Sequence, residues 1–531
     1  MAGSMTATDA VQPSPSAAGY VKASVLGDLL AGRVAQRADA QALVVPWGER
    51  LTWAQLAAVT ASVQRGLVIR GVRPGDRVGL MCDNSPRMAA ALLAIVGLNA
   101  VAVPINTAMV GPGLAFVLDH SEVVHLIGDE IYIERSLSVG GGLGADRCVS
   151  TSDSSRVCSW SEAFGAPGDP ISEGRASDPA VLIYTSGTTG EAKGVVLSHA
   201  AVLAGSRGAA GVMFKATSDD VIYTCLPLFH CAAQQLGLWA CLLSGATLVL
   251  APRFSASSFW AQIDEHHVTA FHFIGPMLSV LWQAPPSPAD TQHHATKAIG
   301  GGPRVAWQEF ADRFALQVVE CYGTTETFGG CVTHRPGMGR LGSVGMAMPY
   351  IEIDIVDEAG LTVMVGDPGE ILIRGREQHV LFTEYLKRPD LTAAAVRGGW
   401  YHTGDVGSFD ADGYLYFHAR TKELIRRRGE NVSILEVENV LSKHPDVRDC
   451  AAAGVASPLG EEDILVSLVP GPSGIDPEEL IAFAAEYLPA FALPRYITIQ
   501  ESIPRTATYR VQRHLLAPLV ATAYDRERPR T

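Results

Sequence analysis

The chain has 531 residues, more than one ordinary domain, and 47% of them are hydrophobic against 18% charged, so it can bury a large core. The net charge of −14 argues against a general nucleic-acid binder or a polybasic membrane binder, although a local anion site remains open. Nine cysteines without a Cys-x-x-Cys pair argue against a disulfide framework or structural zinc site, and they fit a reducing cytoplasm. No stable membrane insertion is expected, because Gly, Asn and Pro interrupt the most apolar stretch, residues 88–105.

The first 20 residues are small and polar, with two prolines, and are expected to form a disordered tail. From there to about residue 340, helical and strand patterns alternate, which is typical of an α/β fold with a largely parallel sheet. The expected helices span residues 53–70, 88–98 and 259–266, and another begins near residue 200. The expected strands span residues 77–81, 100–103, 180–184, 221–225 and 247–250.

After about residue 340 the pattern changes to short alternating segments separated by Gly and Asp turns, which is typical of antiparallel strands. These strands are expected at 351–356, 370–374 and 414–418. The last part, of about 110 residues, predicts a small α+β domain. Its expected strands lie near 432, at 450–455 and at 464–468, and its expected helices at 435–443 and 477–487.

The strongest local signal is a loop that follows the apolar strand ending at Tyr184, and it reads Thr185-Ser-Gly-Thr-Thr-Gly-Glu-Ala-Lys193. Glycines let the backbone turn sharply and bring N–H groups close to an anion, hydroxyl groups donate further hydrogen bonds, and lysine adds charge. The candidate phosphate-binding residues are Thr185, Ser186, Gly187, Thr188, Thr189 and Gly190, with Lys193 as a catalytic candidate. A flexible surface loop is the alternative interpretation. A Walker A loop is excluded because its Gly-Lys-Ser/Thr order is absent.

This loop resembles the phosphate-binding motif of the adenylate-forming superfamily, which includes acyl-CoA synthetases, luciferases and peptide-synthetase adenylation domains. Further segments resemble that family's motifs, in the family's order, over residues 40 to 515. They are Pro227-Leu-Phe-His230, Gly300-Gly-Gly-Pro303, Cys321-Tyr-Gly-Thr-Thr-Glu326, Tyr401-His-Thr-Gly-Asp405, Arg420-Thr-Lys422 and Arg428-Gly-Glu-Asn-Val432. Within the superfamily, residues 227–235 and 259–294 look most like crotonobetaine/carnitine-CoA ligases.

The resemblance implies an α/β fold whose large N-terminal domain contains stacked mixed or parallel sheets and a β-barrel-like subdomain. It also implies a small mobile α+β C-terminal domain that rotates between the two half-reactions. The implied boundaries are a tail at 1–20, the large domain at 21–419, a hinge at 420–423 and the small domain at 424–531.

The resemblance also implies a nucleotide site. Tyr322 would stack on adenine, with a core aromatic as the alternative. Asp405 and Arg420 would hydrogen-bond the ribose, although a loop aspartate can also cap its own turn. The remaining nucleotide-binding candidates are Gly301, Gly302, Pro303, Gly323, Thr324 and Thr325.

Four further residues have roles implied by the resemblance. Glu326 would hold Mg²⁺ through one carboxylate, as magnesium sites that bridge phosphates do, unless it is an ordinary helix-start carboxylate. His230 would sit at the mouth of the acid pocket, although a lone histidine is more often structural. Lys422 corresponds to the hinge residue, and Gly429 to a glycine that lines the pantetheine tunnel, with an ordinary turn glycine as the alternative. The arginine run 426–428 is either a solvated face or a grip on CoA phosphates.

The acid pocket is expected to be lined by residues near 229–235, 300–303 and 322–331. Small residues are frequent there, among them Gly329 and Gly330. These two glycines suggest room for a bulky acid.

The last motif departs from the family pattern. Such ligases end in a loop of the type Pro-x-Thr-x-x-Gly-Lys, whereas this chain reads Pro504-Arg-Thr-Ala-Thr-Tyr-Arg510. Tyr509 replaces the glycine and Arg510 replaces the lysine, which in the family reaches the carboxylate and the α-phosphate during adenylation. Compositional drift is one explanation, because the chain contains only seven lysines against 34 arginines.

Drift does not explain Tyr509, and lysine is retained at 193 and 422. The planar fork of arginine is wider than an ammonium group, and tyrosine resists any positive φ that a glycine supplied. Loss of one well-placed electrostatic donor typically costs on the order of 10²–10³ in rate. We therefore predict that adenylation is weak or lost, while thioester formation from a supplied acyl-adenylate survives.

The expected protein is thus a cytoplasmic acyl-CoA ligase that uses acyl-AMP or AMP, CoA and Mg²⁺, with ATP if adenylation is retained. Its partners would be a small carboxylic acid or its adenylate and, in the half-reaction interpretation, a separate adenylating enzyme. The alternatives are a complete ATP-dependent acyl-CoA synthetase, an adenylation enzyme that loads a carrier protein, and a non-catalytic binding protein. Retention of Asp405, Glu326 and Lys193 weighs against the last.

Overall fold

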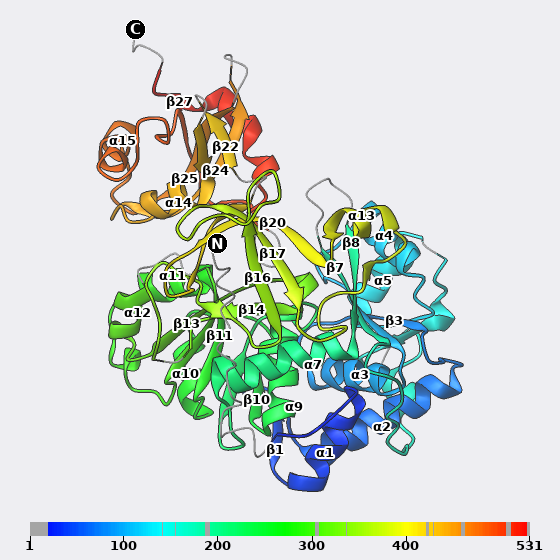
Figure 1. Ribbon diagram of the computed structural model, residues 1–531. Coiled ribbons are helices and arrows are strands. Elements are labelled where there is room, and N and C mark those ends of the chain that lie inside the picture. Colours follow the sequence, from blue (N-terminus) through cyan, green and yellow to red (C-terminus); the bar gives the residue numbers. More distant parts are fainter. Residues whose placement is uncertain are drawn as a thin grey trace. The chain divides into compact units, whose positions relative to one another are not determined.

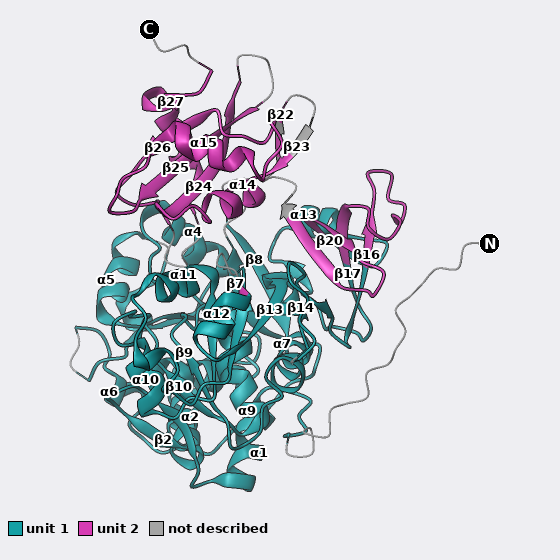
Figure 2. Ribbon diagram, turned by 90° about the vertical axis from the view of Figure 1, so that its left-hand side faces the viewer, with its two compact units in different colours: residues 1–303, 308–353, 373–401 teal, residues 304–307, 354–372, 402–531 magenta. Residues whose placement is uncertain are grey.

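The computed structural model describes residues 20–140, 142–153, 156–185, 192–302, 307–335, 337–420, 424–427, 430–457, 462–505 and 511–527. The chain divides into two compact units (Figure 2). Unit 1 contains residues 1–303, 308–353 and 373–401, and unit 2 contains residues 304–307, 354–372 and 402–531. Within the described ranges, no helix is both long and apolar enough to cross a membrane.

The first sheet of unit 1 consists of β3 (Arg77–Met81), β4 (Val101–Pro104), β5 (His125–Gly128), β6 (Cys148–Ser150), β7 (Pro179–Thr185), β8 (Lys193–Ser198) and β18 (Glu384–Tyr385). Its strand order is β18-β8-β7-β4-β3-β5-β6. Strands β3, β7 and β8 of this sheet are labelled in Figure 1. β3 to β7 run parallel, whereas β8 is antiparallel to β7 and β18 is antiparallel to β8. The short strand β18 therefore lies at the edge of the sheet, beside the strand that follows the predicted phosphate loop.

The second sheet consists of β1 (Gln41–Val44), β2 (Arg50–Thr52), β9 (Val221–Thr224), β10 (Thr247–Leu250), β11 (Ala270–Ile274), β12 (Lys297–Gly301), β13 (Gln317–Thr324), β14 (Gly329–Thr333) and β15 (Met346–Ala347). Its order is β15-β14-β13-β12-β11-β9-β10-β1-β2. β12 and β13 are parallel neighbours, and β13 turns back into the antiparallel β14. The carboxyl ends of β12 and β13, which carry the predicted adenine motif, therefore meet at one edge of the sheet.

Helices cover these sheets, and α3 (Pro86–Gly97) is the most deeply buried of the long ones. Ser85 accepts a hydrogen bond from the Met88 N–H and Pro86 occupies the first turn, which fixes where the helix begins. The other helices before residue 400 are α1 (Gly27–Arg37), α2 (Trp53–Ile69), α4 (Gly111–Ser121), α5 (Glu130–Ser138), α6 (Trp160–Phe164), α7 (His199–Gly208), α8 (Cys231–Ala233), α9 (Ala240–Ser244), α10 (Phe259–Glu265), α11 (Gly275–Gln283), α12 (Trp307–Arg313) and α13 (Pro389–Ala395). Two π-helical segments, Ala209–Phe214 and Gln234–Trp239, continue α7 and α8.

A third, curled sheet contains β16 (Ile351–Val356), β17 (Gly369–Gly375), β19 (Val396–Arg397), β20 (Trp400–Phe409) and β21 (Leu415–Arg420). Its order is β16-β17-β20-β19, and β21 pairs with β20. The division between the two units passes through β16, β17 and β20.

The C-terminal part of unit 2 has a core of its own. It contains β22 (Leu424–Arg427), β23 (Glu430–Ser433), β24 (Val447–Ala456), β25 (Glu462–Pro470), β26 (Tyr496–Ile499), β27 (Tyr524–Asp525), α14 (Ile434–Leu441) and α15 (Pro477–Ala485). Val437 and Leu441 of α14 and Leu480 of α15 are fully buried against the β24–β25 sheet. Such a separate core is typical of an α+β domain.

The predicted α/β class, with several parallel or mixed sheets, a curled sheet and a C-terminal α+β part, is confirmed. The strands expected at 77–81 and 247–250 coincide with β3 and β10. The apolar stretch 88–105 is confirmed as a buried helix followed by a buried strand. The sequence did not predict β18, because a strand of two residues has no alternation to detect.

Candidate active site

The predicted phosphate loop connects the end of β7 to the start of β8. Thr185 and Lys193 form the last backbone pair of these antiparallel strands, so they flank the two ends of the loop. The Lys193 ammonium lies 5.0 Å from the centroid of the Tyr385 ring on β18, within the range of a cation–π interaction. The predicted contacts that lie outside the described residues are Ser186, Gly187, Thr188, Thr189 and Gly190.

The predicted adenine motif lies at the adjoining ends of β12 and β13. Gly302 has φ +64°, a conformation that favours glycine. A Cβ added to Gly301 would lie only 3.0 Å from the carbonyl oxygen of Cys321, so the bare backbone allows β12 to pass close to β13. The structure therefore brings Gly301, Gly302 and Tyr322 to neighbouring strand ends. Pro303 lies outside the described residues.

Glu320, which the sequence did not predict as a site residue, shares this edge. Its carboxylate accepts a hydrogen bond from the Gly302 N–H, and burial raises its pKa to about 8. Near neutral pH this side chain is therefore mostly protonated and uncharged. The only signal in the sequence was an acidic residue at an inward position of an apolar strand, two residues before Tyr322.

A tight turn after β13 presents the metal motif. Gly323 approaches β14 so closely that an added Cβ would lie 1.8 Å from the carbonyl oxygen of Gly329. The chain then forms a 3₁₀ helix over Thr325–Thr327, and the Thr324 N–H donates a 2.9 Å hydrogen bond to Thr327 Oγ1. The backbone geometry of residues 323–325 thus fixes the position of the residue that follows them.

That residue, Glu326, is 9% exposed, and its Oε1 accepts a 2.7 Å hydrogen bond from the Tyr385 hydroxyl. Within the described part of the chain, no donor reaches its Oε2. One oxygen anchored and one open suits a carboxylate that binds Mg²⁺ through a single oxygen. Nowhere in the described ranges do three or more His, Cys, Asp or Glu side chains form a group that could hold a metal ion.

The histidine motif lies beside the same turn. The His230 N–H donates a 3.0 Å hydrogen bond to the Pro227 carbonyl, and among the described residues its buried Nε2 has no partner. Burial lowers the pKa of His230 to about 4, so the ring is neutral at physiological pH. The Cys231 sulfur lies 3.8 Å from Thr325 Oγ1, which brings this segment against the Glu326 turn.

The space expected near Gly329 and Gly330 is filled by side chains. A Cβ added to Gly329 would lie 2.4 Å from Gln235 Oε1, and one added to Gly330 would lie 2.7 Å from Met213 Cε. Gln235 is fixed there, because it accepts a 2.8 Å hydrogen bond from the Gly330 N–H and donates a 3.1 Å hydrogen bond to the Gly205 carbonyl. These glycines permit close packing of β14 and do not provide room for a bulky acid.

Unit 2 carries the two predicted ribose contacts, Asp405 and Arg420. Asp405 on β20 is 1% exposed, and its N–H donates a 3.0 Å hydrogen bond to Thr403 Oγ1. Its backbone pairs with that of Arg420 on β21. The side chain of Arg420, together with Lys422 and Gly429, lies outside the described residues.

The arginine run at 426–428 contains one buried member. Arg427 is 2% exposed, its Nε lies 3.0 Å from Asp463 Oδ1, and it donates a 2.5 Å hydrogen bond to the Leu493 carbonyl. This side chain therefore belongs to a buried ion pair, and neither of the two predicted roles for the run applies to it. The side chains of Arg426 and Arg428 are not described.

The base of the altered C-terminal loop is anchored on both sides. Arg505 donates hydrogen bonds of 2.7 and 2.8 Å to the carboxylate of Asp449, and its backbone forms an antiparallel bridge with Val511. Beyond the loop, Arg513 lies 2.5 Å from the buried carboxylate of Glu438. The two substituted positions lie outside the described residues: Tyr509 and Arg510.

Comparison with protein families agrees with this arrangement. The model of the AMP-binding enzyme family matches residues 30–386, and that of the AMP-binding enzyme C-terminal domain matches residues 436–510. The chain belongs to the AMP-binding enzyme family. The first match covers the predicted phosphate, histidine, adenine and metal motifs, and the second ends at Arg510.

The relatives of this AMP-binding enzyme include acyl-CoA ligases. The crotonobetaine/carnitine–CoA ligase of Salmonella paratyphi A is 31% identical over 467 residues, which cover 83% of this chain and 88% of that protein. The o-succinylbenzoate CoA synthetase of Bacillus subtilis, solved with its acyl-adenylate, is 27% identical with a TM-score of 0.79, covering 92% of this chain and 97% of that one. An anthranilate CoA ligase solved with anthranoyl-AMP, 24% identical, shares the fold with a TM-score of 0.86 over 95% of this chain and 98% of that one. The predicted resemblance to adenylate-forming acyl-CoA ligases is confirmed.

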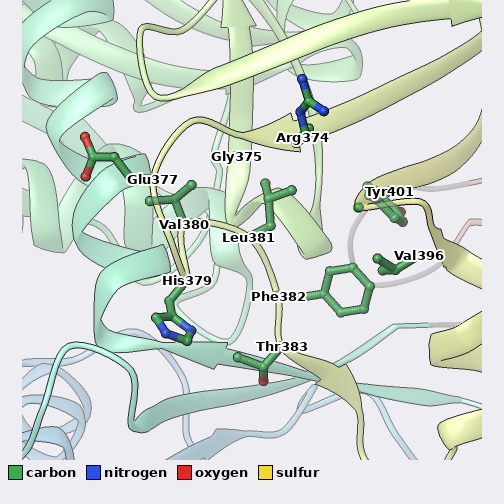
Figure 3. Close-up of a pocket in the computed structure, with 11 residues that line it drawn as sticks. Arg374, Gly375, Glu377, His379, Val380, Leu381, Phe382, Thr383, Val396 and Tyr401 are labelled. Atoms are coloured by element: carbon green, nitrogen blue, oxygen red, sulfur yellow. The ribbon is translucent and has the colours of Figure 1, made fainter.

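The AMP-binding enzyme also has a separate pocket of about 430 Å³ in unit 1 (Figure 3). Its wall consists of Arg374, Gly375, Glu377, residues 379–383, Val396, Gly399 and Tyr401. Val396 and Tyr401 lie beside Phe382. None of the predicted site residues lines it. The Phe382 ring lies 5.3 Å from that of Tyr401 and 5.0 Å from that of Tyr385, so the pocket shares an aromatic wall with the cluster that holds Tyr385.

Proposed function

We propose that this AMP-binding enzyme is an acyl-CoA ligase that forms a CoA thioester from an acyl-adenylate, and that its own adenylation step is weak or lost. In thioester formation the CoA sulfur attacks the acyl carbonyl carbon. The bond from that carbon to the phosphate oxygen breaks, AMP leaves with the bonding electrons, and the thiol proton passes to solvent. The observation that carries the restriction is Tyr509-Arg510 in place of the family's Gly-Lys.

The retained nucleotide motifs support a site for an adenylate. Residues 185–190 with Lys193 would surround the phosphates, and Tyr322 with Gly301 and Gly302 would hold the adenine. Asp405 and Arg420 would bind the ribose hydroxyls. These assignments follow from the motif order and from the described geometry at the ends of β7, β8, β12 and β13.

At the acid end of the proposed site, the acyl group would meet an uncharged side chain. His230 is uncharged near pH 7 and has a buried Nε2 with no partner in the described ranges, so it can hydrogen-bond the acyl carbonyl without adding charge. Because its relatives are named for them, crotonobetaine and carnitine come first in the panel of acids, followed by o-succinylbenzoate.

The restriction to one half-reaction rests on the physics of two side chains. An arginine fork cannot occupy the volume of an ammonium group, and tyrosine removes the conformational freedom of glycine. The anchors at Arg505 and Arg513 hold the base of the loop in place, so a defect would arise from the loop residues themselves. No lysine follows Lys443 to substitute.

A complete ATP-dependent ligase is the second candidate, and one observation favours it. Arg510 keeps the positive charge, and the chain is poor in lysine throughout. A complete ligase would need Mg²⁺ for its adenylation step. Glu326, with one oxygen anchored and the other open within the described part, would hold it in either case.

The deciding experiment supplies CoA with each acid plus ATP and, in parallel, CoA with the matching synthetic acyl-AMP. We expect thioester from the acyl-AMP and, at most, about 1% of that rate from acid plus ATP, given a 10²–10³-fold loss. Equal rates from both would overturn the restriction and leave an ordinary ligase. A phosphopantetheinylated carrier protein offered in place of CoA separates the carrier-loading alternative.

The substituted positions provide a gain-of-function test. Arg510→Lys combined with Tyr509→Gly should raise ATP-dependent thioester formation at least about tenfold, while the rate from acyl-AMP changes little. Arg448→Lys, an exposed arginine of the same unit, is the matched control for an arginine-to-lysine change. If the combined loop variant leaves the ATP-dependent rate unchanged, as the control should, the loop does not limit adenylation.

A further inference from the structure

Tyr385 is held in place from two sides by the backbone of the first sheet. It pairs with Val195 across β18 and β8, and the Leu386 N–H donates a 2.8 Å hydrogen bond to the Gly194 carbonyl. Its own N–H donates a 2.9 Å hydrogen bond to Thr392 Oγ1 in α13. These hydrogen bonds fix the backbone from which the Tyr385 ring extends. Its partner Val195 lies two residues after Lys193 on β8.

From that position the side chain meets two residues of the proposed site that come from different sheets. Its hydroxyl donates to Glu326 Oε1 at 2.7 Å, and the centroid of its ring lies 5.0 Å from the Lys193 ammonium. Lys193 begins β8 in the first sheet, whereas Glu326 follows β13 in the second. Tyr385 is 5% exposed, so both contacts lie in a largely dry environment where they are stronger than in water.

A second connection secures the same junction. The Phe382 N–H donates a 2.8 Å hydrogen bond to the Glu326 carbonyl, and the Phe382 ring packs on Tyr385. The hydroxyl therefore engages one carboxylate oxygen of Glu326, and the other oxygen is left to face away from it.

We propose that Tyr385 is a positioning residue for the nucleotide phosphates. Its hydroxyl orients Glu326 for metal binding through the other carboxylate oxygen, and its ring holds the Lys193 ammonium at the end of the phosphate loop. The proposal rests on the proposed function, because it takes Glu326 as the magnesium ligand and Lys193 as a phosphate contact. A group that orients a metal ligand in this way typically changes metal affinity 10–100-fold when removed.

The test measures metal binding directly, so it does not require that the protein adenylates. Mn²⁺ is titrated into the full-length protein saturated with a non-hydrolysable ATP analogue, and free Mn²⁺ is followed by electron paramagnetic resonance. We expect Tyr385→Phe to weaken Mn²⁺ binding in the ternary complex about tenfold, while AMP binding without metal is unchanged. A purely structural role would instead lower both affinities together.

Tyr385→Leu removes the ring as well as the hydroxyl. It should weaken binding of the ATP analogue itself by a further factor of about three, because the Lys193 ammonium loses its aromatic partner. If Tyr385→Leu does not fold, Tyr385→Phe alone still decides, since it keeps the ring and its packing on Phe382. Wild-type Mn²⁺ affinity in folded Tyr385→Phe would overturn the proposal.

Two controls separate this proposal from the proposed function. Tyr223→Phe removes another buried hydroxyl, which donates a 2.8 Å hydrogen bond from β9 to Gln262 Oε1 in α10, and it should leave Mn²⁺ affinity unchanged. Glu326→Gln should lower Mn²⁺ affinity more than Tyr385→Phe does. If Glu326→Gln binds Mn²⁺ like the wild type, the magnesium role itself fails and Tyr385 has no ligand to position.

Discussion

Glu326 in unit 1 and Glu438 in unit 2 are both almost completely buried, yet they are held in opposite ways. Glu326 receives one hydrogen bond, from the neutral hydroxyl of Tyr385, and its other oxygen meets no donor among the described residues. Glu438 accepts from the Ala452 N–H at 2.9 Å and lies 2.5 Å from the Arg513 guanidinium. Among the described residues, a neutral group orients Glu326, whereas a cation pairs with Glu438.

The difference separates a ligand-binding carboxylate from a structural one. Burying a charge costs several kcal/mol unless a countercharge compensates it. Arg513 compensates Glu438 within the fold, whereas in the proposed function a bound Mg²⁺ would compensate Glu326. Arg427 and Asp463 are a second structural pair of this kind, because they neutralise each other in the C-terminal core. A substitution at Glu326 should therefore change ligand binding, whereas loss of the Glu438–Arg513 pair should change the free energy of unfolding.

The largest expected effect is on ligand binding at Glu326. Glu326→Gln keeps an oxygen that accepts from Tyr385 but removes the negative charge, so Mg²⁺·ATP binding should weaken about 100-fold while the thermal midpoint changes little. Calorimetric titration of ATP with and without Mg²⁺ measures this. Thioester formation from supplied acyl-AMP should stay within about threefold of the wild type. If Glu326→Gln lowered the thermal midpoint as well as the affinity for ATP, Glu326 would be a structural residue like Glu438.

The next effect is on stability at Glu438. Arg513→Met leaves a buried carboxylate without its cation and should cost about 3 kcal/mol in the free energy of unfolding, measured by urea denaturation. Adding Glu438→Gln should restore part of that loss, because the uncompensated charge is gone. Nucleotide affinity of the folded protein should not change. Additive losses in the double variant would show that the two side chains do not compensate each other.

A smaller effect concerns Glu320, whose pKa burial raises to about 8. Between about pH 4.5 and pH 8 the unfolded chain releases this proton while the folded chain keeps it, so the stability that Glu320 contributes falls as pH rises. Glu320→Gln cannot ionise. The difference in thermal midpoint between Glu320→Gln and wild type should therefore grow from pH 5 to pH 8, by about 5 °C, and then level off. A difference that is constant with pH would contradict the raised pKa.

Much of the fold followed from local patterns. The Ser85-Pro86 start of α3 and the apolar strand β3 are specified by neighbouring residues, and the predicted elements agree with the structure there to within a few residues. The motif order also indicated the family. These features depend on residues close in sequence, which is why a single sequence reveals them.

The missed parts depend on contacts between distant segments. Tyr385 lies 59 residues from Glu326, and the pairing of β18 with β8 together with the Phe382–Glu326 backbone hydrogen bond brings them together. Gly329 and Gly330 suggested space, but Gln235 and Met213 fill it from helical segments about a hundred residues earlier. The sequence predicted either a solvated face or a grip on CoA phosphates for the run that contains Arg427, because no neighbouring residue indicates Asp463 as its partner. Small size and charge in a sequence do not reveal which neighbour occupies the adjoining volume.

The smallest effect is expected where both charges remain in water. Arg156 and Glu134 form a 3.1 Å ion pair whose side chains are 87% and 54% exposed. Water already solvates both groups, so the pair adds little and Glu134→Gln should change the free energy of unfolding by less than about 0.5 kcal/mol. Raising the salt concentration should abolish even that difference, whereas the Arg513→Met defect should persist because its partner is buried. If the exposed pair cost as much as the buried one, burial would not be what distinguishes the carboxylates of this enzyme.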